Sequence, residues 1–145
     1  MLMNSRLTRL AAVAAAATLA LAACSSDDGD DAGADGGDPG VAFAAPADGD
    51  TVASPVTVEM EATDLTVEAA GEVNEDAGHM HIMIDTDCVA EGEVIPNDDN
   101  HRHFGDGSTS TELELEAGEH TLCLQLADGE HVATSYTDTI TITVE

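Results

Sequence analysis

Six histidines lie in the second half of the 145-residue chain, and four of them form two His-x-His pairs. The first pair is His79 and His81, in an apolar stretch, and the second is His101 and His103. On a β-strand, residues two positions apart project from the same face, about 6.5 Å from each other. Two imidazoles at that spacing can reach one metal ion, and imidazole suits zinc, copper and nickel. The spacing therefore predicts a transition-metal site, for copper or zinc, at these pairs.

Strand alternation also predicts which side chains surround the first pair. It places Met80, Ile82 and Ile84 on the apolar face, and His79, His81, Met83 and Asp85 on the opposite face. Asp85 could orient an imidazole by accepting its second ring N–H, or could simply end the strand in a turn. Met80 and Met83 are conceivable soft ligands for copper(I), although alternation assigns Met80 to the core.

The two single histidines have less certain roles. His120 shares its strand face with Leu122, and His131 follows a turn, so each fits either a supporting metal ligand or a structural side chain. The four paired histidines also have alternatives to metal binding. They could form an exposed polar strand face, or a pH switch made of imidazoles that titrate together.

The elements that must position these residues are strands. From residue 41 onward the apolar spacing is two, and Gly, Pro, Asn and Asp separate the runs. This pattern predicts an all-β, immunoglobulin-like antiparallel sandwich of about seven strands, with a closed barrel as the main competitor. The expected strands lie near 41–44, 51–62, 65–69, 79–85, 108–116, 120–127 and 136–144. A hairpin is expected at residues 117–119, and residues 86–107 form a long connection of the kind that is often functional.

The N-terminal residues carry targeting signals. Arg6 and Arg9 precede an apolar run at residues 10–23 that is typical of an export signal and is too short to span a bilayer. The run ends in Leu-Ala-Ala-Cys24, which resembles a bacterial lipobox. We therefore expect a signal peptide at 1–23, a lipidated Cys24 with an acidic Gly- and Asp-rich tether at 24–40, and a folded domain at 41–145. A plain secretory signal is the alternative.

After lipidation of Cys24, two cysteines stay available in a compartment outside the cytosol. Exported thiols normally oxidise, so Cys88 and Cys123 are expected to form a disulfide. The alternative is that one or both are thiolate metal ligands.

The charge balance restricts the partners. The chain carries 30 Asp and Glu against 3 Lys and Arg, and removal of the signal would leave Arg102 as the only Lys or Arg. Such a protein does not bind nucleic acid through phosphate neutralisation. Its field would concentrate cations near the histidines and repel anionic substrates.

Several segments in order resemble the bacterial exported family known as domain of unknown function 4399, over about residues 46–145. The segments that carry the resemblance are Pro46-Ala47-Asp48-Gly49, Ala77-Gly78-His79-Met80-His81, Ile95-Pro96-Asn97-Asp98, His101-Arg102-His103-Phe104-Gly105, Gly118-Glu119-His120-Thr121-Leu122, and Asp128 with His131. The family pattern places His at all six positions, which implies one constellation: His79, His81, His101 and His103 as ligands, His120 and His131 as supporting ligands, and Asp85 and Asp128 around them. The resemblance implies no established activity. Cys88 and Cys123 depart from the usual family sequence.

A looser likeness links the His-x-His strand to copper/zinc superoxide dismutases. No Lys or Arg follows His103 to guide an anionic substrate, so we do not expect an enzyme. The sequence thus predicts a lipid-anchored extracytoplasmic metal-binding domain in the cell envelope. The alternative is an envelope interaction module that presents residues 89–100 to a partner protein.

Overall fold

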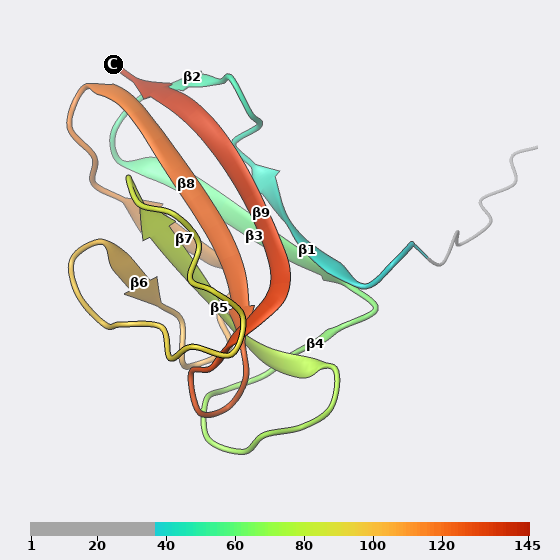
Figure 1. The fold of residues 1–145 in the computed structure, drawn as a ribbon. Coiled ribbons are helices and arrows are strands. Elements are labelled where there is room, and N and C mark those ends of the chain that lie inside the picture. The colour runs from blue at the N-terminus through green and yellow to red at the C-terminus, as the bar shows by residue number, and fades with distance from the viewer. Residues whose placement is uncertain (1–36) are drawn as a thin grey trace, which may run out of the picture. The chain divides into compact units, whose positions relative to one another are not determined.

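The computed structural model describes residues 37–145, which form an immunoglobulin-like β-sandwich (Figure 1). This range contains no helix, and hence none that could cross a membrane. The predicted signal peptide, Cys24 and most of the tether lie outside the described residues. The strands are β1 (Gly40–Ala45), β2 (Thr51–Val52), β3 (Val56–Thr63), β4 (Thr66–Val67), β5 (Ala77–Ile84), β6 (His101–His103), β7 (Ser110–Leu113), β8 (Gly118–Ala127) and β9 (Ala133–Val144).

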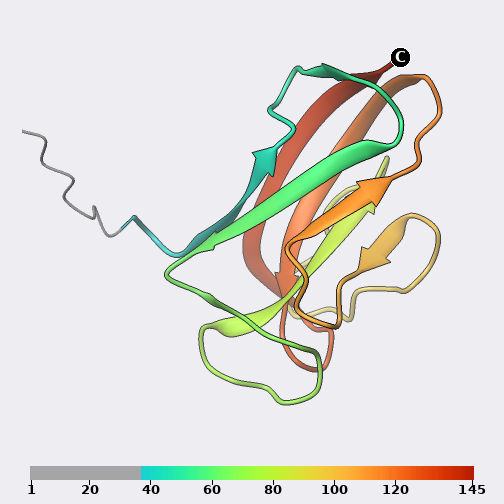
Figure 2. The ribbon, with the colours of Figure 1, turned by 180° about the vertical axis from the view of Figure 1, so that it is seen from behind.

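Two sheets pack face to face. The smaller sheet has the order β1-β3-β7, and the larger has the order β2-β9-β8-β5-β4, with β6 also paired to β5 (Figure 2). Most neighbours are antiparallel, while the short strands β2 and β4 run parallel to β9 and β5. The prediction of an all-β sandwich is confirmed, with the addition of these two short parallel pairs.

The main core lies between the sheets and follows the predicted alternation. Met80, Ile82 and Ile84 of β5 meet Leu122, Leu124 and Leu126 of β8 there, and the smaller sheet contributes Val56, Val58 and Met60. All nine side chains are buried. Burial of a large aliphatic side chain contributes about 1.5–3 kcal/mol, so this layer makes a large favourable contribution to the free energy of folding.

The outer face of the larger sheet is also covered around β5. A loop at residues 85–100, here called the covering loop, crosses it, and Met83, Ile95, Cys123, Ala127 and Ala133 form a second apolar cluster. Two sets of contacts attach the start of this loop to β8. Cys88 and Cys123 form a disulfide with Cα atoms 5.6 Å apart. The Gln125 amide accepts a hydrogen bond from the Val89 N–H at 2.9 Å and donates one to the Val89 carbonyl at 2.8 Å.

Two details of the predicted strand pattern are wrong. The expected strand at 51–62 is interrupted before β3, because Pro55 has no N–H with which to continue a ladder, and its two parts join different sheets. The expected hairpin at 117–119 does not form, because β7 pairs with β3 whereas β8 pairs with β5 and β9. That connection instead crosses from one sheet to the other.

The side chain of His120 links the start of β8 to Asp85, the residue that follows β5. Its Nδ1 lies 2.7 Å from Asp85 Oδ2, and its Nε2 lies 2.9 Å from the Glu116 carbonyl oxygen. Both partners only accept hydrogen bonds, so both ring nitrogens donate in the imidazolium form. The Glu116 carbonyl and, after it, the Asp85 carboxylate raise the pKa of His120.

Removal of the disulfide should destabilise the domain. For the variant C88S/C123S we expect the free energy of unfolding to fall by about 2–4 kcal/mol, because the bridge closes a loop of 35 residues. Urea denaturation measures the difference. The wild-type domain in reductant should match the variant, and equal stability of oxidised wild type and variant would contradict the prediction.

The His120 contacts should make stability depend on pH in a defined direction. Because the folded pKa is raised, the stabilisation is complete below the unfolded value of about 6.5 and is lost as the pH rises through the folded pKa. Urea unfolding of wild type and His120→Gln between about pH 5 and pH 8 should show a difference in stability that shrinks with rising pH. A difference that stays constant would disprove the role given to His120.

Candidate metal centre

Four imidazole rings meet on the outer face of the larger sheet. His79 and His81 come from β5, His103 from β6, and His131 from the turn between β8 and β9. The Nε2 atoms of His79 and His81 are 2.9 Å apart, and those of His103 and His131 are 3.1 Å apart. We call these four residues the imidazole cluster.

The sheet register brings three of the rings together. His79 and His81 project from the same face of β5, as the spacing predicts, and His103 lies directly opposite His81 in the β5–β6 ladder. At the other end, His79 lies opposite Ala127, the last residue of β8. The turn that follows Ala127 therefore begins beside His79, and it carries His131.

Backbone hydrogen bonds fix the turn that carries His131. Asp128 Oδ1 accepts the N–H groups of Glu130 and Val132, both at 2.9 Å, and the Asp128 carbonyl accepts the N–H of His131. His131 itself adopts a left-handed conformation with φ of 68°. The covering loop adds a further hydrogen bond, from the Ile95 N–H to the His131 carbonyl at 2.9 Å. Asp128 therefore acts on the cluster by shaping the turn.

Two glycines leave the space that the cluster needs. A Cβ on Gly105 would overlap the ring of His103, and a Cβ on Gly129 would overlap the carbonyl of Glu72 beside the His131 turn. From the sequence, Gly105 is named only as part of a family segment, and neither glycine is predicted to have a role at the histidines. The sequence feature that could have pointed to Gly105 is its position two residues after the second His-x-His pair.

The cluster is buried, so it is not an exposed polar face. His79 is 0% and His81 1% exposed, while His103 and His131 are half-buried. Desolvation is the main cause that lowers the pKa of His79 to about 4 and that of His81 to about 3, and the neighbouring imidazoles lower both further. Desolvation and His131 likewise lower the pKa of His103. The neutral imidazole, which is the form that binds metals, is thus favoured in these three rings.

The burial of these rings is poorly compensated by hydrogen bonds. Nδ1 of His79 and of His81 has no hydrogen-bond partner among the described residues. Their Nε2 atoms contact only each other as hydrogen-bond partners. Because buried polar atoms are normally satisfied, this arrangement points to a role in binding and not to a stabilising one.

The structure does not bring His101 or His120 into the cluster. His101 lies opposite Met83, two residue pairs beyond the His81–His103 pair, and its Nδ1 is 2.7 Å from Asp98 Oδ1. His120 contacts Asp85, which therefore faces His120 and not His81. His131, expected as a supporting residue, takes the place expected for His101.

The methionines and cysteines considered as possible sulfur ligands have other roles in the structure. Met80 lies in the main core, and Met83 packs in the second apolar cluster. The two cysteines are joined in the disulfide and offer no thiolate. Among residues 37–145, the group suited to hold a metal ion contains His79, His81 and His103, with ligand atoms within 4.8 Å of one another.

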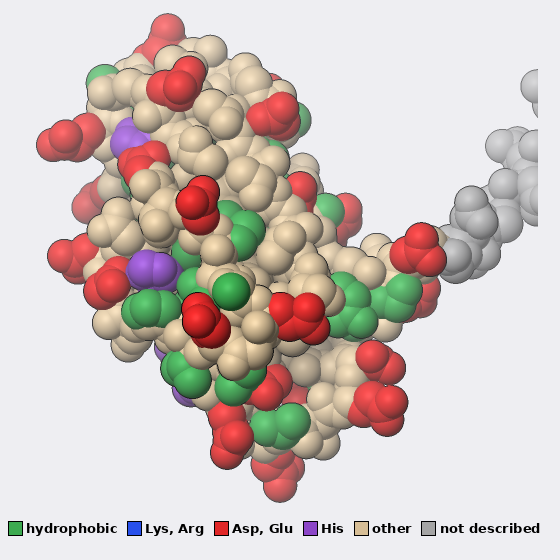
Figure 3. All heavy atoms as spheres, in the orientation of Figure 1, with side chains coloured by type: hydrophobic (Ala, Val, Ile, Leu, Met, Phe, Trp, Pro, Cys, Tyr) green, Lys and Arg blue, Asp and Glu red, His purple; other side chains and the backbone are tan. Residues whose placement is uncertain are grey.

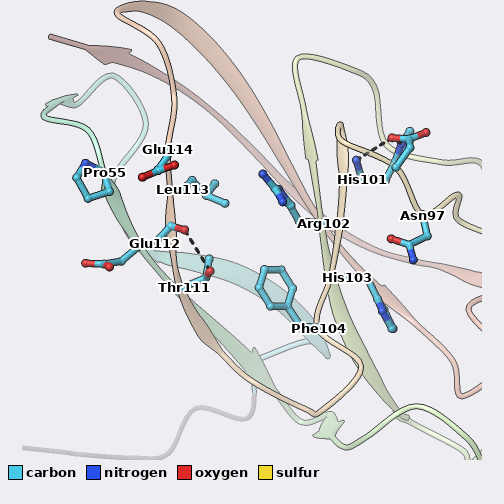
Figure 4. Close-up of a pocket in the computed structure, with 11 residues that line it drawn as sticks. Pro55, Asn97, His101, Arg102, His103, Phe104, Thr111, Glu112, Leu113 and Glu114 are labelled. Carbon is cyan, nitrogen blue, oxygen red and sulfur yellow. Dashed lines mark hydrogen bonds and ion pairs between the residues drawn. The ribbon is translucent and has the colours of Figure 1, made fainter.

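Arg102 lies on the other side of β6 from the histidines. Figure 4 shows its side chain on the side of Leu113 and Glu114, whereas His101 and His103 project from the opposite side of the strand. It lines a groove of about 590 Å³ between β6 and β7. Acidic side chains are scattered over the face seen in Figure 3, with histidines visible between them.

Comparison with known proteins identifies the family of this chain. No curated protein matches the chain. Fibronectin(III)-like modules of CbhA from Clostridium thermocellum resemble it with 18% sequence identity and a TM-score of 0.43, over 74% of this chain and 46% of that chain. The chain thus spans less than half of that structure. The model of the domain of unknown function DUF4399 matches residues 58–145. The chain therefore belongs to the DUF4399 family.

Proposed function

We propose that this protein binds a divalent transition-metal ion, copper or zinc, through His79, His81, His103 and His131. The observation that carries the proposal is the convergence of four imidazole rings, two of them fully buried, on one place in the fold. No hydrogen bond from the described residues to Nδ1 of His79 or His81 offsets the cost of burying these rings. Coordination of a metal ion by the imidazoles would offset it.

The distances fit an ion. With metal–nitrogen bonds of about 2.0–2.1 Å, tetrahedral ligand atoms lie about 3.3 Å from each other. The two closest nitrogen pairs are at 2.9 and 3.1 Å, and the ligand atoms of His79, His81 and His103 lie within 4.8 Å. The separations up to 4.8 Å exceed the tetrahedral value, so metal binding would draw the rings closer together.

The donor set favours the borderline divalent ions. It contains only imidazole nitrogens, since within residues 37–145 the methionines pack in the two apolar clusters and the two cysteines form the disulfide. Soft copper(I) prefers sulfur ligands, and the hard ions calcium and magnesium prefer oxygen. Zinc and copper(II) are the ions that an all-imidazole site suits best.

The role that we assign is binding and buffering of the ion and not catalysis. Four protein ligands leave no coordination position for a substrate, whereas catalytic metal sites keep one open. Arg102, the only cationic side chain besides histidine in residues 37–145, projects from the side of β6 opposite to His101 and His103, so its charge is not directed at the cluster.

We place the protein at the outer side of a membrane, held by lipid on Cys24. The export signal and the lipobox-like residues support this location, and the Cys88–Cys123 disulfide agrees with an oxidising compartment. Incorporation of radiolabelled palmitate in bacteria that express the full chain would test it. Labelling should disappear in Cys24→Ser.

Metal analysis of the purified domain tests the proposal directly. After exposure to zinc or copper and removal of loose ions, residues 37–145 should retain one ion per chain. His79→Ala with His81→Ala should retain none, because half of the ligands are lost. Retention of less than a tenth of an equivalent by the wild-type domain, or equal retention by wild type and variant, would refute metal binding at this cluster.

Two further variants separate ligand loss from misfolding. His103→Gln with His131→Gln alters only half-buried rings, so the fold should survive while metal retention is lost. His101→Gln with His120→Gln is the matched control, because both residues lie outside the cluster. The control should retain the full equivalent, and circular dichroism would confirm the sheet content of each variant.

Gly105 provides a test that leaves every ligand in place. In Gly105→Ala the new methyl group must displace the His103 ring, so the affinity for the metal should fall by about 10–100-fold. Gly40→Ala is the control, since a Cβ there would meet nothing closer than 3.8 Å. Competition with a chromophoric chelator measures both affinities, and unchanged binding by Gly105→Ala would show that the ring position does not matter.

A further inference from the structure

We infer that the imidazole cluster is a tetrahedral zinc site and does not offer the planar arrangement that copper(II) prefers. The inference rests on the proposed function, since it names the ion that the same four rings would take. It is carried by the six distances between the four ring centroids, which describe the shape of the cluster.

Taken in the order His79, His81, His103, His131, the rings form a closed cycle. Neighbouring centroids in this cycle are 4.8, 5.0, 4.7 and 4.9 Å apart. The two distances across the cycle are 5.0 Å for His79 and His103, and 6.0 Å for His81 and His131. Five of the six distances are therefore nearly equal, and the sixth is only moderately longer.

These distances exclude a plane. Four rings in a square with these sides would be about 6.9 Å apart across both diagonals, in the arrangement that copper(II) or nickel(II) favours. A flat rhombus with one diagonal of 5.0 Å would need a second diagonal of about 8.3 Å, well above the 6.0 Å observed. A regular tetrahedron has six equal distances, so the cluster is a slightly flattened tetrahedron.

The fold holds this shape through independent elements. His79 and His81 stand on β5, a strand whose every residue is buried, and His103 is held opposite His81 by the β5–β6 ladder. The Asp128 turn and the hydrogen bond from Ile95 hold His131. To flatten the cluster, His131 would have to move away from His81 and His103 would have to move away from His79, against these contacts.

Zinc fits such a site for electronic reasons. Zn²⁺ has a filled d shell and no geometric preference of its own, and it is four-coordinate and tetrahedral in closed sites. Copper(II) binds nitrogen ligands more tightly in general, but it gains most of that advantage in tetragonal geometry. A rigid tetrahedral set of imidazoles should reduce the advantage of copper and suit zinc.

Cobalt(II) is the probe that tests the geometry. Tetrahedral cobalt(II) absorbs visible light far more strongly than six-coordinate cobalt(II), and it occupies zinc sites. Titration of residues 37–145 with cobalt(II) should produce intense visible bands that saturate at one equivalent. One equivalent of zinc should then abolish the bands by displacing the cobalt.

Matched variants assign the bands to the cluster. In His131→Gln the bands should weaken and the apparent affinity for cobalt should fall at least about tenfold, because a ligand is lost. His101→Gln should reproduce the wild-type spectrum, because His101 contacts Asp98 outside the cluster.

The outcomes distinguish the two proposals. Stoichiometric cobalt binding with only weak, six-coordinate bands would overturn the tetrahedral assignment and leave metal binding intact. Copper(II) bound with the electron paramagnetic resonance parameters of a square-planar four-nitrogen site would overturn it as well. Failure of cobalt, zinc and copper alike to bind would refute the proposed function itself.

Discussion

The fold and the site both depend on the burial of β5 on its two faces. One face contributes Met80, Ile82 and Ile84 to the main core, and the other carries His79, His81 and Met83. A strand in this position tolerates no change of register, since a shift by one residue would exchange the histidines with the core residues. The positions of His79 and His81, the first two proposed ligands, are thus fixed by the same packing that holds the sandwich together.

Buried imidazoles stabilise the outer face of the larger sheet less than apolar side chains would. Other contacts must therefore stabilise this face. The covering loop does so through the disulfide, the amide of Gln125 and the second apolar cluster around Met83. These contacts also hold the turn of His131, because the Ile95 N–H bonds its carbonyl. The contacts that compensate for the buried histidines therefore also hold the fourth histidine of the proposed ligand set in place.

Strand alternation in the sequence was sufficient to predict the sandwich and the shared face of His79 and His81. It could not decide between His101 and His103, because residues two apart have the same face, and only the register of β6 against β5 places His103 beside His81. That register depends on how the 16-residue covering loop folds, which has no periodic signal. The place of His131 beside the other rings could not be predicted for a similar reason, since its position depends on the hydrogen bonds of Asp128 within a turn.

The acidity of the domain acquires a specific meaning at this site. Four neutral imidazoles bring no charge to offset a divalent ion, so compensation must come from beyond the ligands. The nearest contributions act on the cluster through space: Asp128 raises the pKa of His79, and Asp106 raises the pKa of His103, each against the dominant effect of burial. Both effects stabilise positive charge at the cluster. A carboxylate ligand would neutralise the ion locally. In the proposed site the balancing charge would instead be spread over the surroundings, and the coordination shell would hold nitrogen alone. The same field that favours a cation there disfavours an anionic substrate, which is consistent with the proposed role of holding a metal ion.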